Sequence, residues 1–166
     1  MPRLALPRLL LGCVLCAGIH GDVCSILHGS KCVSDELAQR IRDFNTVLNS
    51  GKHDLSDYRE LRSLMTANGL DGKSVHVGHI LPNAAWSCDN FCEAHGLSHC
   101  RCRRHASCSK SNPLNCGWNL MAQPANENVW LSDKEVPEDT CLHWGRDCSS
   151  TYLNPPVDAL PGLKEL

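Results

Sequence analysis

Two separated segments of the chain carry residues suited to acid–base and metal chemistry. In the first segment, residues 75–83 (VHVGHILPN), a histidine directly follows a glycine near the end of an expected strand. The second segment, residues 119–135, places three amides before an aromatic and an acidic residue: Asn119, Gln123, Asn128, Trp130 and Glu135. A neutral imidazole accepts a proton near physiological pH, and oxygen atoms are the ligands that hard divalent cations prefer. Because asparagine also caps helices and fills loops, an ordinary helix start stays open as the alternative interpretation.

Together the two segments resemble the non-specific DNA/RNA endonucleases of the ββα-metal (His-Me finger) class, which are relatives of the HNH nucleases. That family combines a Gly-His strand motif with a later segment of the form Asn-x-x-x-Gln-x-x-x-x-Asn, after which a Trp and a Glu commonly follow. Gly78-His79 matches the first motif, and the amides of residues 119–128 match the second. The resemblance is confined to these two segments.

The resemblance implies a role for each matching position. His79 would be the general base that deprotonates a water for attack on phosphorus. Asn128 would hold a hydrated Mg²⁺, or another divalent cation, through its side-chain oxygen. Asn119 and Gln123 would brace the loop and the helix, and Glu135 would act on the water shell of the metal. The implied catalytic residues are His79, Glu135 and Asn119, the metal ligand is Asn128, and Gln123 and Trp130 are structural. The expected substrate is DNA, RNA or both, cleaved with little sequence specificity.

One position departs from the family pattern. Members often carry Asp-Arg-Gly-His, whereas this chain has His76-Val77-Gly78-His79, so the arginine that stabilises transition-state charge is absent from its place. The candidates for nucleic-acid binding in its stead form a basic cluster: Arg101, Arg103, Arg104 and Lys110. Beside a cleft this cluster could hold a phosphate backbone without reading bases. It could equally form the solvated face of a loop.

Cysteine is the most unusual feature of the composition, with twelve residues. Ten of them follow residue 21, and such usage is ordinary in exported proteins and rare in reducing compartments. An even number predicts about five disulfides, whose pairing the sequence does not give. The later cysteines are assigned structural roles: Cys88, Cys92, Cys100, Cys102, Cys108, Cys116, Cys141 and Cys148. Cys88, Cys92, His95 and His99 also have spacings open to a structural Zn²⁺, which we rank below disulfides.

The N-terminal segment predicts export. Arg3 and Arg8 accompany a short apolar run over residues 9–17 and small residues follow, which is the pattern of a signal peptide over residues 1–21. The run is too short to span a membrane. We therefore predict a secreted protein.

The formal charge of −2 argues against a nucleic-acid binder that works by bulk positive charge.

Periodicity indicates the elements that must position these residues. Residues 34–50 predict a helix capped by a serine, and a second helix begins near Ser56 and stops at Asn68-Gly69. Residues 73–81 change to strand periodicity. Residues 86–118 show no periodicity and predict a cysteine-rich insertion shaped by cross-links. A last helix starts at a proline, residue 124, and runs toward residue 134.

These elements predict an α+β fold, with a small ββα-metal core, N-terminal helices and a disulfide-rich insertion. The expected parts are a helical region over residues 22–72, a nuclease core over residues 73–148 and an extended or mobile Pro-rich tail over residues 149–166. The alternative function is a non-catalytic secreted binding or inhibitor module. A nuclease must bring His79 and Asn128 to one small polar cleft, and a binding module has no reason to do so.

Overall fold

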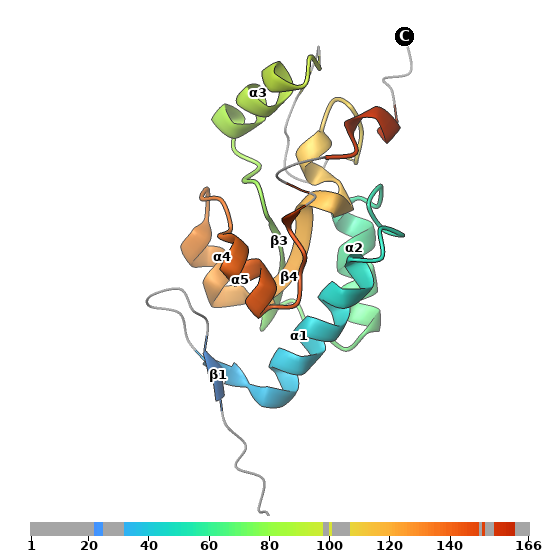
Figure 1. The fold of residues 1–166 in the computed structure, drawn as a ribbon. Coiled ribbons are helices and arrows are strands. Elements are labelled where there is room, and N and C mark those ends of the chain that lie inside the picture. The colour runs from blue at the N-terminus through green and yellow to red at the C-terminus, as the bar shows by residue number, and fades with distance from the viewer. Residues whose placement is uncertain are drawn as a thin grey trace, which may run out of the picture.

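A pair of antiparallel strands, β3 (Val75–His79) and β4 (Leu120–Pro124), lies between helices on either side (Figure 1). Helix α4 (Ala125–Leu131) follows β4 directly and contacts both strands. The structure is a computed structural model that describes residues 22–24, 32–97, 100, 107–149, 151 and 155–161. The predicted signal peptide, Cys102 and the arginines at 101, 103 and 104 lie outside this described part. The described part is an α+β structure with a ββα unit at its centre, as predicted.

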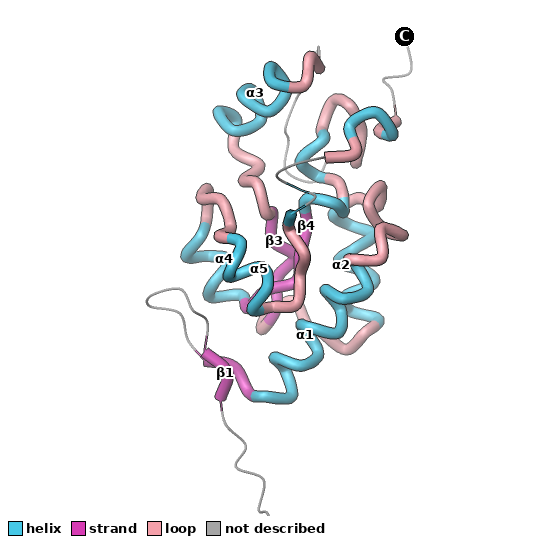
Figure 2. Tube along the Cα trace, viewed as in Figure 1, coloured by secondary structure: helices cyan, strands magenta, loops and turns pink. Residues whose placement is uncertain are grey.

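The two predicted N-terminal helices are present and start at the expected caps. Helix α1 (Asp35–Leu48) begins after Ser34, whose side chain accepts a hydrogen bond from the third residue of the helix. Helix α2 (Tyr58–Ala67) begins with a capping box, in which the side chains of Asp57 and Glu60 each accept from the other residue's backbone N–H. Helix α1 contacts β4 and helix α2 contacts β3, so these helices cover the sheet opposite α4 (Figures 1 and 2).

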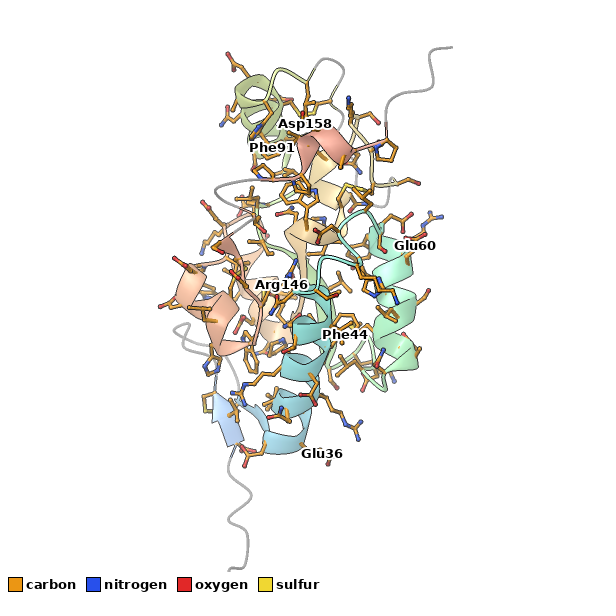
Figure 3. All side chains as sticks on the ribbon, turned by 45° about the vertical axis from the view of Figure 1, so that its right-hand side comes forward. Glu36, Phe44, Glu60, Phe91, Arg146 and Asp158 are labelled. Carbon is orange, nitrogen blue, oxygen red and sulfur yellow. A yellow bond between two sulfur atoms is a disulfide. The ribbon has the colours of Figure 1, made fainter. Side chains whose placement is uncertain are left out.

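The outer edge of β4 is completed by two buried polar side chains. Asn45 of α1 donates to the carbonyl oxygen of Ala122 and accepts from its N–H, both at 2.8 Å. Arg146 is 3% exposed and donates to the carbonyl oxygen of Leu120 at 3.2 Å; Figure 3 shows it in the middle of the molecule. Burial lowers the pKa of Arg146, and the charge of Asp54 opposes this shift. Because β4 is buried along its length, these side chains supply hydrogen-bond partners that water does not.

Helix α4 is held in place by a buried carboxylate. Glu127 has no exposed surface, and its two carboxylate oxygens accept from Trp144 Nε1 at 3.0 and 2.9 Å. Trp144 follows helix α5 (Glu138–His143) and is fully buried in the main core cluster with Leu131 of α4. Since Glu127 precedes Asn128, this contact fixes the part of α4 that carries the predicted metal ligand.

The described disulfides are all local. They join cysteines seven or eight residues apart in the chain: Cys24–Cys32, Cys92–Cys100, Cys108–Cys116 and Cys141–Cys148. The first links β1 (Asp22–Cys24) to β2 (Cys32–Ser34), and Cys88 is disulfide-bonded as well. This confirms the prediction of a disulfide-rich fold and indicates an oxidising environment. Within the described residues, no helix is long and apolar enough to cross a membrane.

Two segments differ from the sequence prediction. The insertion contains a helix, α3 (Ala85–Ala94), because Cys88 and Cys92 lie one helical turn apart and are buried as small apolar residues. The tail was expected to be extended or mobile, yet residues 157–159 form a 3₁₀ turn and Leu160 is 4% exposed. Leu160 packs in a second, smaller core cluster with Trp118 and the buried cysteines of the insertion.

Candidate active site

A pocket of about 420 Å³ lies beside β3 and is lined by residues from α2, β3, α4 and the insertion. His79 of β3 and Asn128 of α4 both line it. Two cations, Arg62 and Lys134, also line the pocket, and its lining contains no aspartate or glutamate. The pocket therefore brings together an imidazole, an amide and positive charge, a set of groups suited to an anionic ligand.

The amide of Asn128 is held against the bare backbone of Gly78. Gln123 Nε2 donates to Asn128 Oδ1 at 2.7 Å, and Asn128 Nδ2 lies 3.2 Å from His76 Nδ1. A Cβ built on Gly78 would lie 2.6 Å from Asn128 Oδ1 and closer still to the Gln123 amide nitrogen. Glycine is required here because the two amides occupy the space of a side chain.

The imidazole of His79 is oriented by groups on two other elements. Its Nε2 lies 3.1 Å from Oδ1 of Asn115, and its ring stacks on Tyr58 of α2 with centroids 5.9 Å apart. Asn83 Nδ2 is 3.5 Å from the same ring nitrogen, so the contact with Asn115 is the closer one. The tautomer that satisfies this closer contact carries its proton on Nε2 and its lone pair on Nδ1, because an amide oxygen only accepts.

Asn119 supports the loop that follows β3. Its Oδ1 accepts from Leu81 N–H at 2.7 Å, and its Nδ2 lies 2.9 Å from the carbonyl oxygen of Leu81 and 2.8 Å from that of Leu114. Asn119 is fully buried. It therefore positions the backbone and cannot touch a substrate, which corrects its assignment to the catalytic group.

The turn after α4 gives the pocket part of its wall. Ser132 lines the pocket and has φ 49° and ψ −94°, a conformation that non-glycine residues rarely adopt. Such backbone strain concentrates at binding and catalytic sites. Beyond the turn, Lys134 Nζ lies 4.3 Å from the ring centroid of the half-exposed Trp130.

Several predicted site residues are not brought to the pocket. Glu135 is exposed and is not among the lining residues, so the structure does not bring it to the pocket of His79 and Asn128, and its action on a metal's water shell stays a prediction. Helix α4 ends at Leu131 and the Ser132 turn redirects the chain, whereas the prediction continued the helix to residue 134. Lys110 is half-buried in the insertion and does not line the pocket.

Asn115 and Arg62 are among the lining residues that the sequence interpretation did not assign to the site. Asn115 precedes a cysteine in a segment without periodicity, so nothing local indicates its role. Arg62 lies four residues after Tyr58 and therefore on the same face of α2. That spacing identifies Arg62 only once Tyr58 is known to line the pocket.

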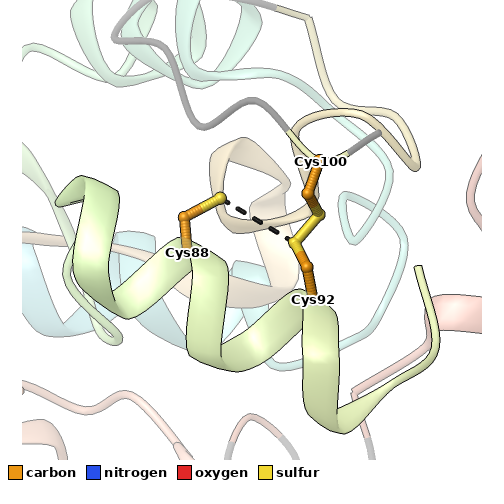
Figure 4. A group of neighbouring side chains, drawn as sticks. All are labelled: Cys88, Cys92 and Cys100. Atoms are coloured by element: carbon orange, nitrogen blue, oxygen red, sulfur yellow. Dashed lines mark hydrogen bonds between the residues drawn. A yellow bond between two sulfur atoms is a disulfide. The ribbon is translucent and has the colours of Figure 1, made fainter. Parts of the chain in front are cut away.

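The cysteines of α3 favour disulfides over zinc. The sulfurs of Cys88, Cys92 and Cys100 lie within 4.8 Å of one another, close enough for a metal if reduced (Figure 4). Cys92 and Cys100 are bonded to each other, and Cys88 is disulfide-bonded too. Metal binding requires thiolates, so an oxidised group offers no zinc ligands. His95 is exposed, and His99 lies outside the described residues.

No protein family, curated protein or solved structure matches the chain. Function is therefore inferred from the chemistry of the pocket. Asn128 Oδ1 can accept a second bond besides that from Gln123, because a carbonyl oxygen has two lone pairs. The described lining offers a divalent cation one amide oxygen and no carboxylate, so such an ion would need its remaining ligands from water and from a substrate phosphate.

We predict that Gly78→Ala displaces the Asn128 amide while leaving the fold intact. The added methyl group overlaps both amides, and overpacking of this kind costs about 1–3 kcal/mol in the free energy of unfolding. Denaturant unfolding measures the cost, and NMR of the Asn128 side-chain amide reports the displacement. Gly72→Ala is the matched control, because its Cβ would lie 3.4 Å from a flexible Arg62 nitrogen. Equal stability of the two variants with an unchanged Asn128 resonance would contradict the prediction.

Proposed function

We propose that this protein is an exported, divalent-cation-dependent nuclease that hydrolyses phosphodiester bonds of DNA, RNA or both with little sequence specificity. The observation that carries the proposal is that His79 and Asn128 line one pocket on a ββα unit. The local disulfides support an oxidising environment, and residues 1–21 support export. A binding module has no need for an oriented imidazole beside a held amide.

His79 is proposed as the general base. Asn115 Oδ1 accepts a hydrogen bond from Nε2–H, so the lone pair of the ring is on Nδ1. Nδ1 takes a proton from the attacking water as the water oxygen approaches phosphorus. The nearly parallel ring of Tyr58, with centroids 5.9 Å apart, restricts rotation of the imidazole. A base that is already oriented lowers the entropic part of the barrier.

Asn128 is proposed as the protein ligand of the cation. The bonds to Gln123 and His76 fix the orientation of the amide, and the second lone pair of Oδ1 is the one that would bind the cation. A divalent cation bound by Asn128 would neutralise charge at the phosphate and at the departing oxygen. The pocket's own cations, Arg62 and Lys134, add positive charge that binds the phosphate and offsets the negative charge that develops on it.

The first test is nucleic-acid digestion with Mg²⁺ by wild type and by His79→Ala. Loss of the base is expected to lower the rate by about 10²- to 10⁴-fold, and a chelator is expected to abolish cleavage by the wild type. His95→Ala is the matched control, because that histidine is exposed on the insertion and outside the pocket. Cleavage that survives both the chelator and His79→Ala excludes this mechanism. A folded wild type that cleaves neither DNA nor RNA with any divalent cation favours the binding module.

A second prediction concerns the orientation of His79. Asn115→Leu removes the acceptor for the Nε2 proton, so we expect kcat to fall about 10- to 100-fold with little change in KM. Asn115→Asp retains an acceptor oxygen at the same position and is expected to restore most of kcat. Steady-state kinetics on an oligonucleotide, with unfolding measured in parallel, separates orientation from stability. If the two variants lose activity equally, Asn115 does not act through the imidazole.

A further inference from the structure

A groove runs along the outer face of α2 and continues from the candidate active site. It has a volume of about 430 Å³ and is lined by Tyr58, Arg59, Arg62, Ser63 and Thr66. Tyr58 and Arg62 also line the pocket that contains His79 and Asn128. The two hollows therefore share a boundary, and a chain molecule bound in one can extend into the other.

The two arginines of this α2 groove are exposed and unpaired. Neither Arg59 nor Arg62 forms a salt bridge or a side-chain hydrogen bond with another residue of the described part. In contrast, Arg40 on α1 is paired with Glu36 at 2.7 Å. The charge of Arg59 and Arg62 is thus available to an anionic ligand.

The acidic residues nearest along α2 are occupied by the helix itself. Asp57 accepts from the backbone N–H groups of Arg59 and Glu60, and Glu60 accepts from the N–H of Asp57. These contacts satisfy the N-terminal donors of the helix. Neither Asp57 nor Glu60 lines the groove, whose lining contains two arginines and no acidic residue.

Arg62 of the groove also lies at the edge of the candidate active-site pocket. One of its guanidinium nitrogens lies 3.4 Å from the site of a Cβ on Gly72, and Gly72 lines the active-site pocket. Arg59 and Arg62 are three residues apart on one face of the helix, about 5–6 Å between Cβ atoms. The hydroxyl group of Ser63 is a further donor for phosphate or sugar oxygens, whereas that of Thr66 already donates to the carbonyl oxygen of Arg62 at 3.1 Å.

We infer that the α2 groove binds the phosphodiester backbone next to the bond that is cut, with Arg62 in the place of the arginine missing before Gly78. This inference rests on the proposed nuclease function and names the surface that holds its substrate. Contacts of guanidinium groups with phosphates carry no sequence information, in keeping with an enzyme of low specificity. Lys110, the described member of the basic cluster predicted for this role, lines neither the pocket nor the groove.

The test measures binding of a duplex oligonucleotide by fluorescence anisotropy over a range of salt concentrations. The full disulfide-bonded chain carries His79→Ala, so that the probe is not consumed. Each lost phosphate contact reduces the slope of log affinity against log salt by about one, so Arg59→Gln with Arg62→Gln is expected to reduce it by about two. Arg40→Gln is the matched control for the loss of an exposed helical arginine, and it should leave the slope unchanged. The same substitutions in the wild-type background are assayed for cleavage.

The outcomes separate this inference from the nuclease proposal. If the wild type cleaves nucleic acid and the double variant keeps the slope of the Arg40→Gln control, the α2 groove is not the substrate surface. If the salt dependence of binding falls by the expected amount in the double variant but the wild type does not cleave, the groove is a binding surface and the nuclease proposal fails. If no binding is detected for the parent chain, both are overturned.

Discussion

The missing side chain at Gly78 is the constraint on which the candidate site depends. Two amides fill the space of a side chain there, so Asn128 lies against strand β3 instead of pointing to solvent. This arrangement holds only while β3 and β4 keep their register and α4 follows without a gap. The register pairs Gly78 with Met121, and the same strand β4 supplies Gln123. The site is therefore a direct consequence of one strand pairing, and a shift of a single residue would remove it.

Packing rather than cross-linking maintains that pairing. The described disulfides close short loops and tie no distant segments together, so each adds only about 2–3 kcal/mol and none joins β3 to β4. Buried polar side chains hold β4 and α4 in place instead. Asn45 completes the edge of β4, Arg146 binds the backbone just before it, and Trp144 fixes α4 through Glu127. The cysteine-rich insertion is cross-linked within itself. Hydrogen bonds of Asn119 and of the backbone around Gly117 attach it to the strands and helices of the core.

The sequence was informative where the structure is local. Caps and apolar spacing predicted α1 and α2, strand periodicity predicted β3, and the spaced amides led to Asn128. It failed where position depends on contacts between distant segments. Asn115 reaches His79 because the next residues of the insertion are held against the start of α2. Gly117 packs closely on the backbone carbonyl of His53, and Cys116 forms an antiparallel β-bridge with Asp57. Glu135 was misplaced because the backbone at Ser132 turns through a positive φ that no local pattern predicts.

The central claim is that a divalent cation binds at Asn128 Oδ1 within reach of His79, and Mn²⁺ titration monitored by NMR tests it most directly. In a mixture of the His79→Ala protein and an oligonucleotide, we predict that the lowest Mn²⁺ concentrations broaden the side-chain amide signals of Asn128 and Gln123. The exposed amide of Gln39 on α1 should stay sharp at the same Mn²⁺ concentration. Broadening confined to exposed carboxylates such as Asp35 and Glu36, with the Asn128 amide unaffected, would contradict the claim.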